Sequence, residues 1–291
     1  MPFCDKVIIV KPWGHFNMLR KFLLITLLLF ISYPAFSKEV RIIHISDSHF
    51  STLGQGYSER DVAPSEKVLT DAVNDINKIK NKSFVLFSGD NIDKPNPDEL
   101  ERFLKIANKL NCPYYVVIGN HEVSKYQQFS KKDYLAIVRK HSKNCRPKNP
   151  NYMFKKDGLV FLVVDGAKES IPGASGYFKE DTLKWLDRML RKYKNDYVVI
   201  FQHFPIEAPY FNKTHRTFDV EGYKTILDKH TNVIAIASGH YHANSEKMVD
   251  GIYHISTPSL LEDEEHNYKI IDIEVNGKKR PRIYTRTRHA E

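Results

Sequence analysis

Aspartate, asparagine and histidine residues recur in short clusters directly after apolar runs of the sequence. In chain order the clusters are Asp47-Ser48-His49, Gly89-Asp90-Asn91-Ile92-Asp93, Gly119-Asn120-His121-Glu122, Gln202-His203 and Gly239-His240-Tyr241-His242. Carboxylates, a carboxamide and imidazoles without cysteine suit Mn²⁺, Fe²⁺ or Zn²⁺, whereas Mg²⁺ and Ca²⁺ favour more oxygen ligands. The clusters therefore predict a metal site built from several parts of the chain.

Seven of these residues are candidate metal ligands, namely Asp47, His49, Asp90, Asn120, His203, His240 and His242. Seven ligands are too many for one ion, but with one shared carboxylate they suit two ions that have four protein ligands each. Two divalent ions about 3.5–4 Å apart clamp the oxygens of a phosphate ester and lower the pKa of a bound water. The residue types thus favour metal-assisted hydrolysis of phosphate esters.

The elements that must position these clusters are short β-branched runs that alternate with helical patterns. The predicted strands are Val40–Ser46, Phe84–Ser88, Tyr114–Ile118, Val160–Asp165, Tyr197–Gln202 and Val233–Ser238. Apolar residues at helical spacing predict helices over Pro64–Ile79, Pro97–Leu110 and Asp181–Tyr193. This alternation indicates an α/β fold with a largely central sheet. Because ligands bind at the carboxyl ends of the strands in such folds, the clusters can converge in space.

The C-terminal part of the sequence has a different pattern, with strands and no helix between them. The predicted strands there are Glu246–Val249, Gly251–Ser256, Tyr268–Val275 and Arg282–Thr285. They predict a β-meander that closes the domain. Because no repeat, low-complexity linker or composition boundary interrupts the chain, we expect residues 38–291 to form a single domain that ends in a basic tail.

The order Asp-x-His, Gly-Asp-x-x-Asp, Gly-Asn-His-Glu, His and Gly-His-x-His resembles the calcineurin-like metallophosphoesterases, and it extends from Asp47 to His242. Its third and last motifs are similar to the branch of class III cyclic-nucleotide phosphodiesterases and acid sphingomyelinase-like enzymes. The resemblance implies a two-sheet β-sandwich flanked by helices. It also implies one metal bound by Asp47, His49, Asp90 and His242, with Asp90 bridging to a second metal that Asn120, His203 and His240 complete.

The same resemblance makes His121 the general acid that protonates the leaving oxygen and Asp93 the carboxylate that orients it. These roles suit the residue types, because imidazole titrates near neutral pH and a carboxylate partner fixes its tautomer. The implied reaction is attack on phosphorus by a metal-bridging hydroxide. Tyr241, between two ligand histidines, and His215, in the loop after His203, are candidate substrate contacts.

The expected function is hydrolysis of a small phosphodiester with two divalent metal ions, manganese or iron before zinc. A phosphomonoesterase or nucleotidase would share every motif and is the alternative. A non-catalytic binding module would be expected to lose ligands or the acid, and here all are present. Taken singly, each ligand has a structural interpretation, with Asp47 and Asp90 as turn formers and Asn120 in a left-handed conformation. Their joint occurrence favours the metal site.

The N-terminal segment predicts export. Phe22–Tyr33 is a run of twelve uncharged residues after Arg20-Lys21, shorter than the about 20 residues of a membrane span. We expect residues 1–37 to be a signal peptide that is cleaved after Ser37, with Met18 as an alternative start. The expected location is periplasmic or secreted, or anchored in the membrane if this segment is retained. Cys112 and Cys145 would then form one disulfide or remain two free thiols.

The net charge of +9 comes from 44 Lys+Arg against 35 Asp+Glu in 291 residues. Residues 1–37 contribute +3 and residues 277–291 contribute +5, so the part with the clusters is nearly neutral. This distribution favours a small phosphate ester over a nucleic acid as the partner, because no nucleic-acid-binding face is indicated. We expect the basic tail to be solvated. Three cysteines are too few for a disulfide scaffold.

Overall fold

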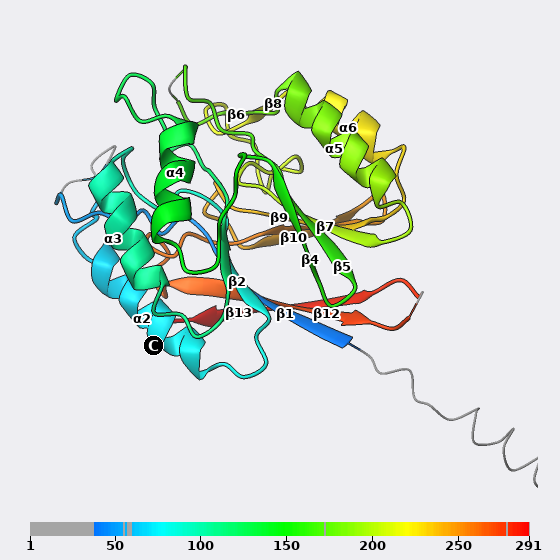
Figure 1. Ribbon diagram of the computed structural model, residues 1–291, viewed down its shortest axis with the longest axis horizontal. Coiled ribbons are helices and arrows are strands. Elements are labelled where there is room, and N and C mark those ends of the chain that lie inside the picture. Colours follow the sequence, from blue (N-terminus) through cyan, green and yellow to red (C-terminus); the bar gives the residue numbers. More distant parts are fainter. Residues whose placement is uncertain (1–37, 55, 57–59, 172, 278, 291) are drawn as a thin grey trace, which may run out of the picture. The chain divides into compact units, whose positions relative to one another are not determined.

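The computed structural model describes residues 38–290 apart from 55, 57–59, 172 and 278 (Figure 1). The predicted signal peptide, its alternative as a membrane anchor and the alternative start at Met18 fall on residues 1–37 and lie outside the described residues. Within the described part, no helix combines the length and the apolar character that a membrane span needs.

The first sheet has five strands in the order β13-β12-β1-β2-β3. Their bounds are β1 (Lys38–Ile45), β2 (Phe84–Phe87), β3 (Tyr114–Val116), β12 (Asn267–Val275) and β13 (Arg282–His289). β1, β2 and β3 run parallel, while β12 is antiparallel to both β1 and β13. The carboxyl ends of β1, β2 and β3 therefore meet at one edge of this sheet.

The second sheet has six strands in the order β10-β11-β9-β7-β5-β4. Their bounds are β4 (Tyr152–Lys156), β5 (Leu159–Val163), β7 (Tyr197–Phe201), β9 (Val233–Ser238), β10 (Ser245–Val249) and β11 (Ile252–Ser256). The four inner strands are parallel and the two edge strands antiparallel. A separate pair joins β6 (Gly176–Tyr177) to β8 (Thr217–Phe218).

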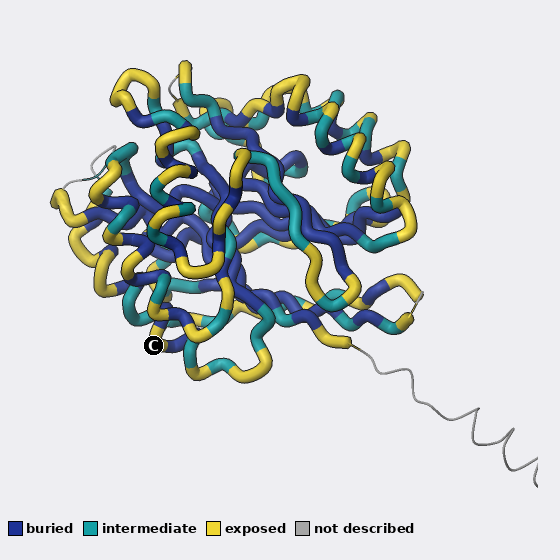
Figure 2. Tube along the Cα trace, in the orientation of Figure 1, coloured by how far each residue is buried: buried dark blue, intermediate teal, exposed yellow. Residues whose placement is uncertain are grey.

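The inner strands of each sheet are buried on both faces, which explains the continuous apolar runs of the sequence. On β1, Val40 and Ile42 belong to an apolar cluster between the sheets, whereas Ile43 and Ile45 belong to the cluster that includes the helices. Phe84 of the first sheet meets Phe161 of the second with ring centroids 5.2 Å apart. Figure 2 shows the strands as a largely buried interior surrounded by more exposed helices and loops.

Five helices flank the sheets, namely α2 (Ser65–Lys78), α3 (Pro97–Ala107), α4 (Lys131–His141), α5 (Glu180–Lys192) and α6 (Val220–Leu227). In Figure 1, α2, α3 and α4 stand together on one side, and α5 and α6 on the other. The predicted α/β fold, a two-sheet sandwich flanked by helices, is thus confirmed. α4 and α6 are additional to the three predicted helices.

Local sequence explains where two of these helices begin. The Asn96 side chain accepts hydrogen bonds from the backbone N–H groups of Asp98 and Glu99, and Pro97 occupies the first helical position of α3. Ser130 and Asp133 form a capping box at the start of α4. This box is the signal that could have revealed α4.

The expected single meander at the C-terminus is divided between the two sheets. β10 and β11 form a hairpin that adds to β9, while β12 and β13 form a second hairpin that adds to β1. The strands were identifiable from apolar periodicity, but periodicity does not say which sheet a hairpin joins. These last strands therefore complete both sheets instead of closing one.

Much of the basic tail is a strand, β13, whose residues remain mostly exposed as expected. β13 pairs with β12 along its length, from Arg282 opposite Glu274 to His289 opposite Asn267. Arg288 donates to the buried Asp75 of α2 with Nε and Nη2 at 2.8 and 2.6 Å from its oxygens. The solvated tail that we expected is thus wrong for this arginine.

Cys112 and Cys145 are both free thiols, so the alternative without a disulfide is the one observed.

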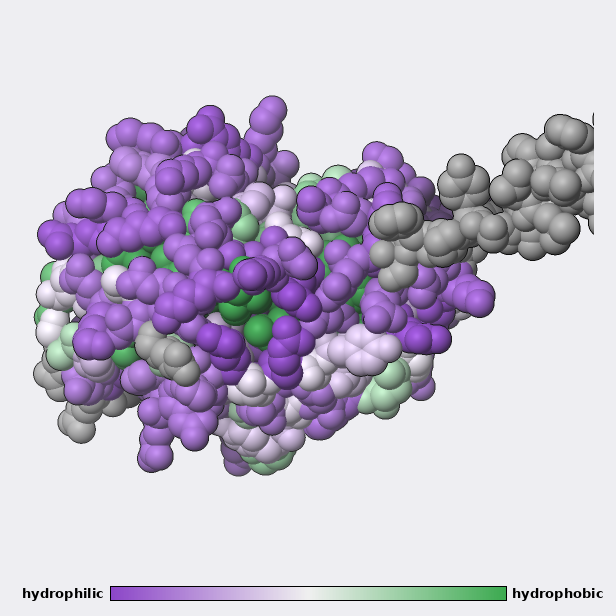
Figure 3. Space-filling view, turned by 90° about the horizontal axis from the view of Figure 1, so that it is seen from below, coloured by the Kyte–Doolittle hydropathy of each residue, from purple (hydrophilic) through white to green (hydrophobic). Residues whose placement is uncertain are grey.

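The face drawn in Figure 3 is mostly hydrophilic, with apolar side chains visible only in separate small areas of that view.

Candidate active site

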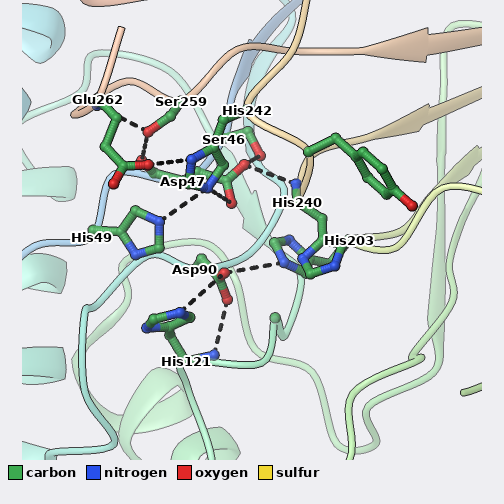
Figure 4. Close-up of polar contacts among 12 residues, drawn as sticks. Ser46, Asp47, His49, Asp90, His121, His203, His240, His242, Ser259 and Glu262 are labelled. Carbon is green, nitrogen blue, oxygen red and sulfur yellow. Dashed lines mark hydrogen bonds and ion pairs between the residues drawn. The ribbon is translucent and has the colours of Figure 1, made fainter. Parts of the chain in front are cut away.

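The loops after strands of both sheets bring the seven candidate ligands together. Three groups of potential metal-binding atoms form, each with all atoms within 4.8 Å of one another, and two of them consist of candidate ligands: Asp47, His49 and His242, and Asp90, His203 and His240. The third consists of His49, Asp93 and His121. Asn120 joins the second group, since its Oδ1 lies 3.2 Å from Nε2 of His203. Figure 4 shows the two groups side by side, with Asp90 placed toward both His121 and His203.

Five of the seven candidate ligands have left-handed backbones. The φ angles are 52° for Asp47, 39° for His49, 50° for Asp90, 70° for His240 and 51° for His242. This conformation is uncommon for residues with a side chain and is typical of functional sites. The strand ends are therefore bent in a way that turns these side chains inward.

Two motif glycines are required by close packing against the carboxylates. A Cβ atom on Gly239 would overlap the Ser46 hydroxyl, and one on Gly119 would overlap Oδ1 of Asp90. Gly-His-x-His and Gly-Asn-His-Glu thus begin with glycine because the backbone passes directly beside Asp47 and Asp90.

The first group brings one carboxylate oxygen and two imidazole nitrogens close together. Oδ2 of Asp47 accepts the Ser46 hydroxyl and, at 3.0 Å, the backbone N–H of His240, whereas the buried Oδ1 has no hydrogen-bond partner. Nε2 of His242 lies 3.3 Å from this Oδ1 and 3.3 Å from Nε2 of His49. A cation among these three atoms would satisfy all of them, so the donor set fits a metal ion.

The histidine tautomers of the second group leave one nitrogen free to bind a cation. Nδ1 of His203 donates to the carbonyl of Ser88 at 2.9 Å, and its Nε2 lies 3.2 Å from Oδ2 of Asp90. Nε2 of His240 donates to the carbonyl of His215 at 2.9 Å, which leaves Nδ1 as its free nitrogen. These outer hydrogen bonds orient the rings as in known metal sites.

The electrostatics of the site favour added positive charge. Burial lowers the pKa of His203 and His242, but the neighbouring Asp90 and Asp47 outweigh it and raise these pKa values to about 9 and about 10. Burial keeps His240 neutral, with a pKa lowered to about 3. Two of the rings therefore hold protons that divalent cations would displace.

His121 lies at the edge of both groups. Its Nδ1 donates to the backbone carbonyl of Asp93 at 2.5 Å, and its backbone N–H donates to Oδ1 of Asp90 at 2.9 Å. Its Nε2 is 3.9 Å from Oδ2 of Asp90. The Asp93 carboxylate is 3.9 Å from Nδ1 and pairs at 2.7 Å with Arg60. Asp93 thus holds the ring mainly through its carbonyl, which the sequence did not reveal.

Glu122 organises the backbone that carries two of the motifs. Its buried carboxylate accepts from the backbone N–H groups of Gly119, Asp90, Asn91 and Ile92. Burial and the charge of Asp90 raise its pKa, while the backbone donors act in the opposite direction. Glu122 therefore supports the structure of the site, because its carboxylate binds backbone N–H groups.

Glu262 and Arg60 support the site from segments that carry no motif. The Glu262 carboxylate accepts from Nδ1 of His242, and its other oxygen is 2.6 Å from Nε of Arg60. Arg60 also donates to the Asp93 carboxylate, and it thereby links the His242 side of the site to the His121 side. The need of a ligand histidine for an acidic partner was the only signal for Glu262.

A pocket of about 390 Å³ opens over the two groups. Arg60, Asp90, Asn120, His121 and His215 are among its lining residues. His215 therefore lines this pocket, and its contact with a substrate stays a prediction. Tyr241, by contrast, is only 3% exposed and is not among the residues that line the pocket.

Comparison with known proteins gives a consistent picture. Residues 40–244 match the family model described as calcineurin-like phosphoesterase. A probable glycerophosphodiester phosphodiesterase GpdQ of Arcobacter nitrofigilis is 26% identical over 232 residues, 75% of this chain and 77% of the relative. A probable cyclic nucleotide phosphodiesterase of Colwellia psychrerythraea is 25% identical over 218 residues, 73% of this chain and 74% of the relative.

Among solved structures, the dimetal phosphatase from Danio rerio superimposes with a TM-score of 0.64 at 18% identity, covering 87% of this chain and 99% of that one. This likeness concerns the fold. The family model covers more than two thirds of the sequence, including every cluster that forms the site. The chain therefore belongs to the calcineurin-like phosphoesterase family.

Proposed function

We propose that this protein is a dinuclear metal-dependent phosphodiesterase that acts on a small phosphodiester. The observation that carries the proposal is the buried Oδ1 of Asp47, which lacks a hydrogen-bond partner and faces the nitrogens of His49 and His242. A buried carboxylate oxygen of this kind is costly unless a cation binds it. Family membership supports metal-dependent ester hydrolysis in general.

The residues that would hold two ions are those of the two groups. Asp47, His49 and His242 would hold one, Asn120, His203 and His240 the other, and Asp90 would be shared by both. Two divalent cations supply Lewis acidity to the phosphoryl oxygens and to the attacking water. Mn²⁺ or Fe²⁺ are the ions that this mixture of imidazole and oxygen donors suits best, with Zn²⁺ as the alternative.

His121 would act as the general acid. The bond from Nδ1 to the Asp93 carbonyl leaves Nε2 directed toward Asp90 and the pocket. Nε2 would carry the proton that passes to the leaving oxygen. An alkoxide leaving group gains more from this proton than a phenoxide does, because it is the stronger base.

Phosphodiesters are favoured because two relatives are named for glycerophosphodiester and cyclic nucleotide hydrolysis. The alternative is a phosphomonoesterase on the same residues. Rates on bis-p-nitrophenyl phosphate and p-nitrophenyl phosphate, measured on metal-analysed protein, decide between them. We expect chelation to abolish hydrolysis and Mn²⁺ or Fe²⁺ to restore it. Activity that survives complete metal removal would refute the proposal.

Export is proposed from the N-terminal sequence. An enzyme outside the cytoplasm would scavenge phosphate or nucleotides and would not degrade a cytoplasmic messenger. Fractionation of cells that express the full-length chain tests this, with N-terminal sequencing of the product. We expect a processed protein outside the cytoplasm that begins at Lys38, whereas processed protein in the cytoplasm would contradict export.

A further inference from the structure

A row of buried polar side chains runs from β11 to Asp47. Thr257 Oγ1 is 2.8 Å from Nδ1 of His44, and Nε2 of His44 is 2.7 Å from Ser88 Oγ. Ser88 Oγ is 2.8 Å from Ser46 Oγ, which in turn bonds to Oδ2 of Asp47. We call these five residues the His44 relay, and each of them is at most 2% exposed.

The chemistry of Asp47 fixes the direction of every bond in the His44 relay. An ionised carboxylate only accepts, so the Ser46 hydroxyl must donate to it. Ser46 then accepts from Ser88, and Ser88 accepts from Nε2–H of His44. With its proton on Nε2, the ring has a lone pair on Nδ1, which accepts the Thr257 hydroxyl. Burial lowers the pKa of His44 to about 3 and keeps the ring neutral in this tautomer.

The relay acts on one oxygen of Asp47 and leaves the other free. Oδ2 is occupied by the Ser46 hydroxyl and the backbone N–H of His240, whereas Oδ1 faces His242. A carboxylate without these two donors could rotate about its χ2 angle and exchange its oxygens. Donors in series also polarise one another, so the effect of the first donor reaches the last.

We propose that the His44 relay is a positioning device that fixes the rotation of the Asp47 carboxylate and thereby raises metal affinity at Asp47, His49 and His242. This proposal rests on the proposed metal site. His44 and Thr257 are the residues to which it assigns a new role, as positioning residues three and four bonds along the relay from the carboxylate. Outer hydrogen bonds of this kind change metal affinity by about 10–100-fold in known sites.

Thr257 offers the sharpest test, because Thr257→Val replaces a hydroxyl by a methyl of similar size at the far end of the relay. Nδ1 of His44 then loses its donor, while Nε2–H stays bonded to Ser88, so the ring is held through one nitrogen only. We expect the ¹⁵N shift of Nδ1 to move to that of an imidazole nitrogen without a hydrogen bond, with the Nε2–H tautomer kept. We also expect the Kd of the apo-protein for Mn²⁺, from calorimetric titration, to rise several-fold.

Three further variants make the test decisive. Ser88→Ala interrupts the relay closer to Asp47 and is expected to raise the Kd for one of the two Mn²⁺ ions about 10-fold. Thr257→Ser keeps the hydroxyl and is expected to keep both the hydrogen bond to Nδ1 and the affinity. Ser142→Ala is the control, because it removes a buried hydroxyl that binds the Cys145 N–H instead.

The possible results separate this proposal from the proposed function. Unchanged Mn²⁺ affinity in Thr257→Val and Ser88→Ala, with normal binding by the wild type, would overturn the relay alone. An equal loss in Ser142→Ala would also overturn it, because the effect would then be general destabilisation. A wild-type protein that binds no Mn²⁺ would instead refute the metal site.

Discussion

Asp47 and Asp75 are both buried aspartates on ends of regular elements, but their surroundings differ in one respect. Both oxygens of Asp75 have donors, since Tyr268 Oη lies 2.6 Å from Oδ2 and Arg288 donates to each oxygen. Asp47 has donors on Oδ2 alone, and Oδ1 is left without one. The first arrangement is complete as it stands, and in the proposed site a cation would complete the second.

The hydrogen-bond donors around these two aspartates distinguish a structural carboxylate from one that is proposed to bind a metal. Burial alone does not distinguish them, because Asp75, Asp47 and Asp90 are all at most 2% exposed. The unpaired Oδ1 does separate Asp47 from Asp75, and Asp90 is set apart by its neighbouring histidines, with Nε2 of His203 3.2 Å from its Oδ2. Asp75 should therefore govern stability, and Asp47 and Asp90 should govern metal binding.

The largest effect expected is that of Asp90→Ala. The loss of a shared carboxylate should remove both metals and lower kcat by more than about 10³-fold, because the cations stabilise the charge of the transition state. Metal analysis by mass spectrometry and single-turnover assays measure the two effects. Asp75→Ala is the matched control and should keep both metals. Retention of two metals per chain by Asp90→Ala would contradict a shared role.

His121→Ala should separate chemistry from metal binding. We expect kcat to fall by about 10²–10⁴-fold, because the leaving oxygen loses its proton donor, while the metal content stays at that of the wild type. A substrate with a p-nitrophenolate leaving group should be affected less than one with an alkoxide. Unchanged turnover on both substrates would remove His121 from the mechanism.

Glu262→Gln should weaken metal binding without abolishing it. The amide can still contact Nδ1 of His242 but no longer carries the charge that holds this ring and Arg60. We expect a rise of about 10-fold in the Kd for Mn²⁺, measured by titration of the apo-protein. Glu265→Gln, in the same loop, should bind Mn²⁺ as the wild type does. Equal affinities for the two variants would show that Glu262 is dispensable.

The smallest effect on activity and the clearest one on stability should come from Arg288→Ala. Asp75 would lose two charged donors, and the free energy of unfolding should fall by about 2 kcal/mol with kcat unchanged. Arg282→Ala, on the same strand but 72% exposed at its side chain, should change it by less than about 0.5 kcal/mol. Urea unfolding measures both.

Arg288→Ala should also change the pH at which the protein unfolds in acid. Hydrogen bonds from Arg288 hold the pKa of Asp75 in the folded protein below its ordinary value of 3.8. Because this folded pKa is depressed, the contribution is complete above that pH and is lost as the pH falls through the folded value. Arg288→Ala should therefore unfold at a higher pH than the wild type, and identical acid transitions would contradict the role of this pair.

Much of the fold could be predicted because apolar periodicity is a local property. Val233–Ser238 was expected as a strand and is β9 with the same bounds. α6 and the two-residue strands β6 and β8 were missed, because eight- and two-residue elements carry little periodicity. The placement of the C-terminal hairpins in different sheets depends on tertiary packing, to which the pattern of a single strand is insensitive.

The candidate site was predictable where residue types coincide with strand ends. Asp47, Asp90 and His240 each follow a strand, so their convergence could be foreseen. Glu262 and Arg60 lie in irregular segments, and the path of such segments is set by packing far away in sequence. His44 and Ser88 looked like ordinary strand residues, since the donor chain that joins them exists only between paired strands.

The division of the C-terminal hairpins has a consequence for how the protein is made. β1, at the start of the described chain, needs β12, with His44 opposite Lys269, and β9 needs β11. Ser259 and Glu262, which hold Asp47 and His242, also lie beyond the segment that matches the family. Pairing between such distant segments closes long loops and is slow. A nascent chain that ended at residue 244 would therefore hold every proposed ligand and still lack the framework that orients them, so we expect metal binding to follow synthesis of the last strands.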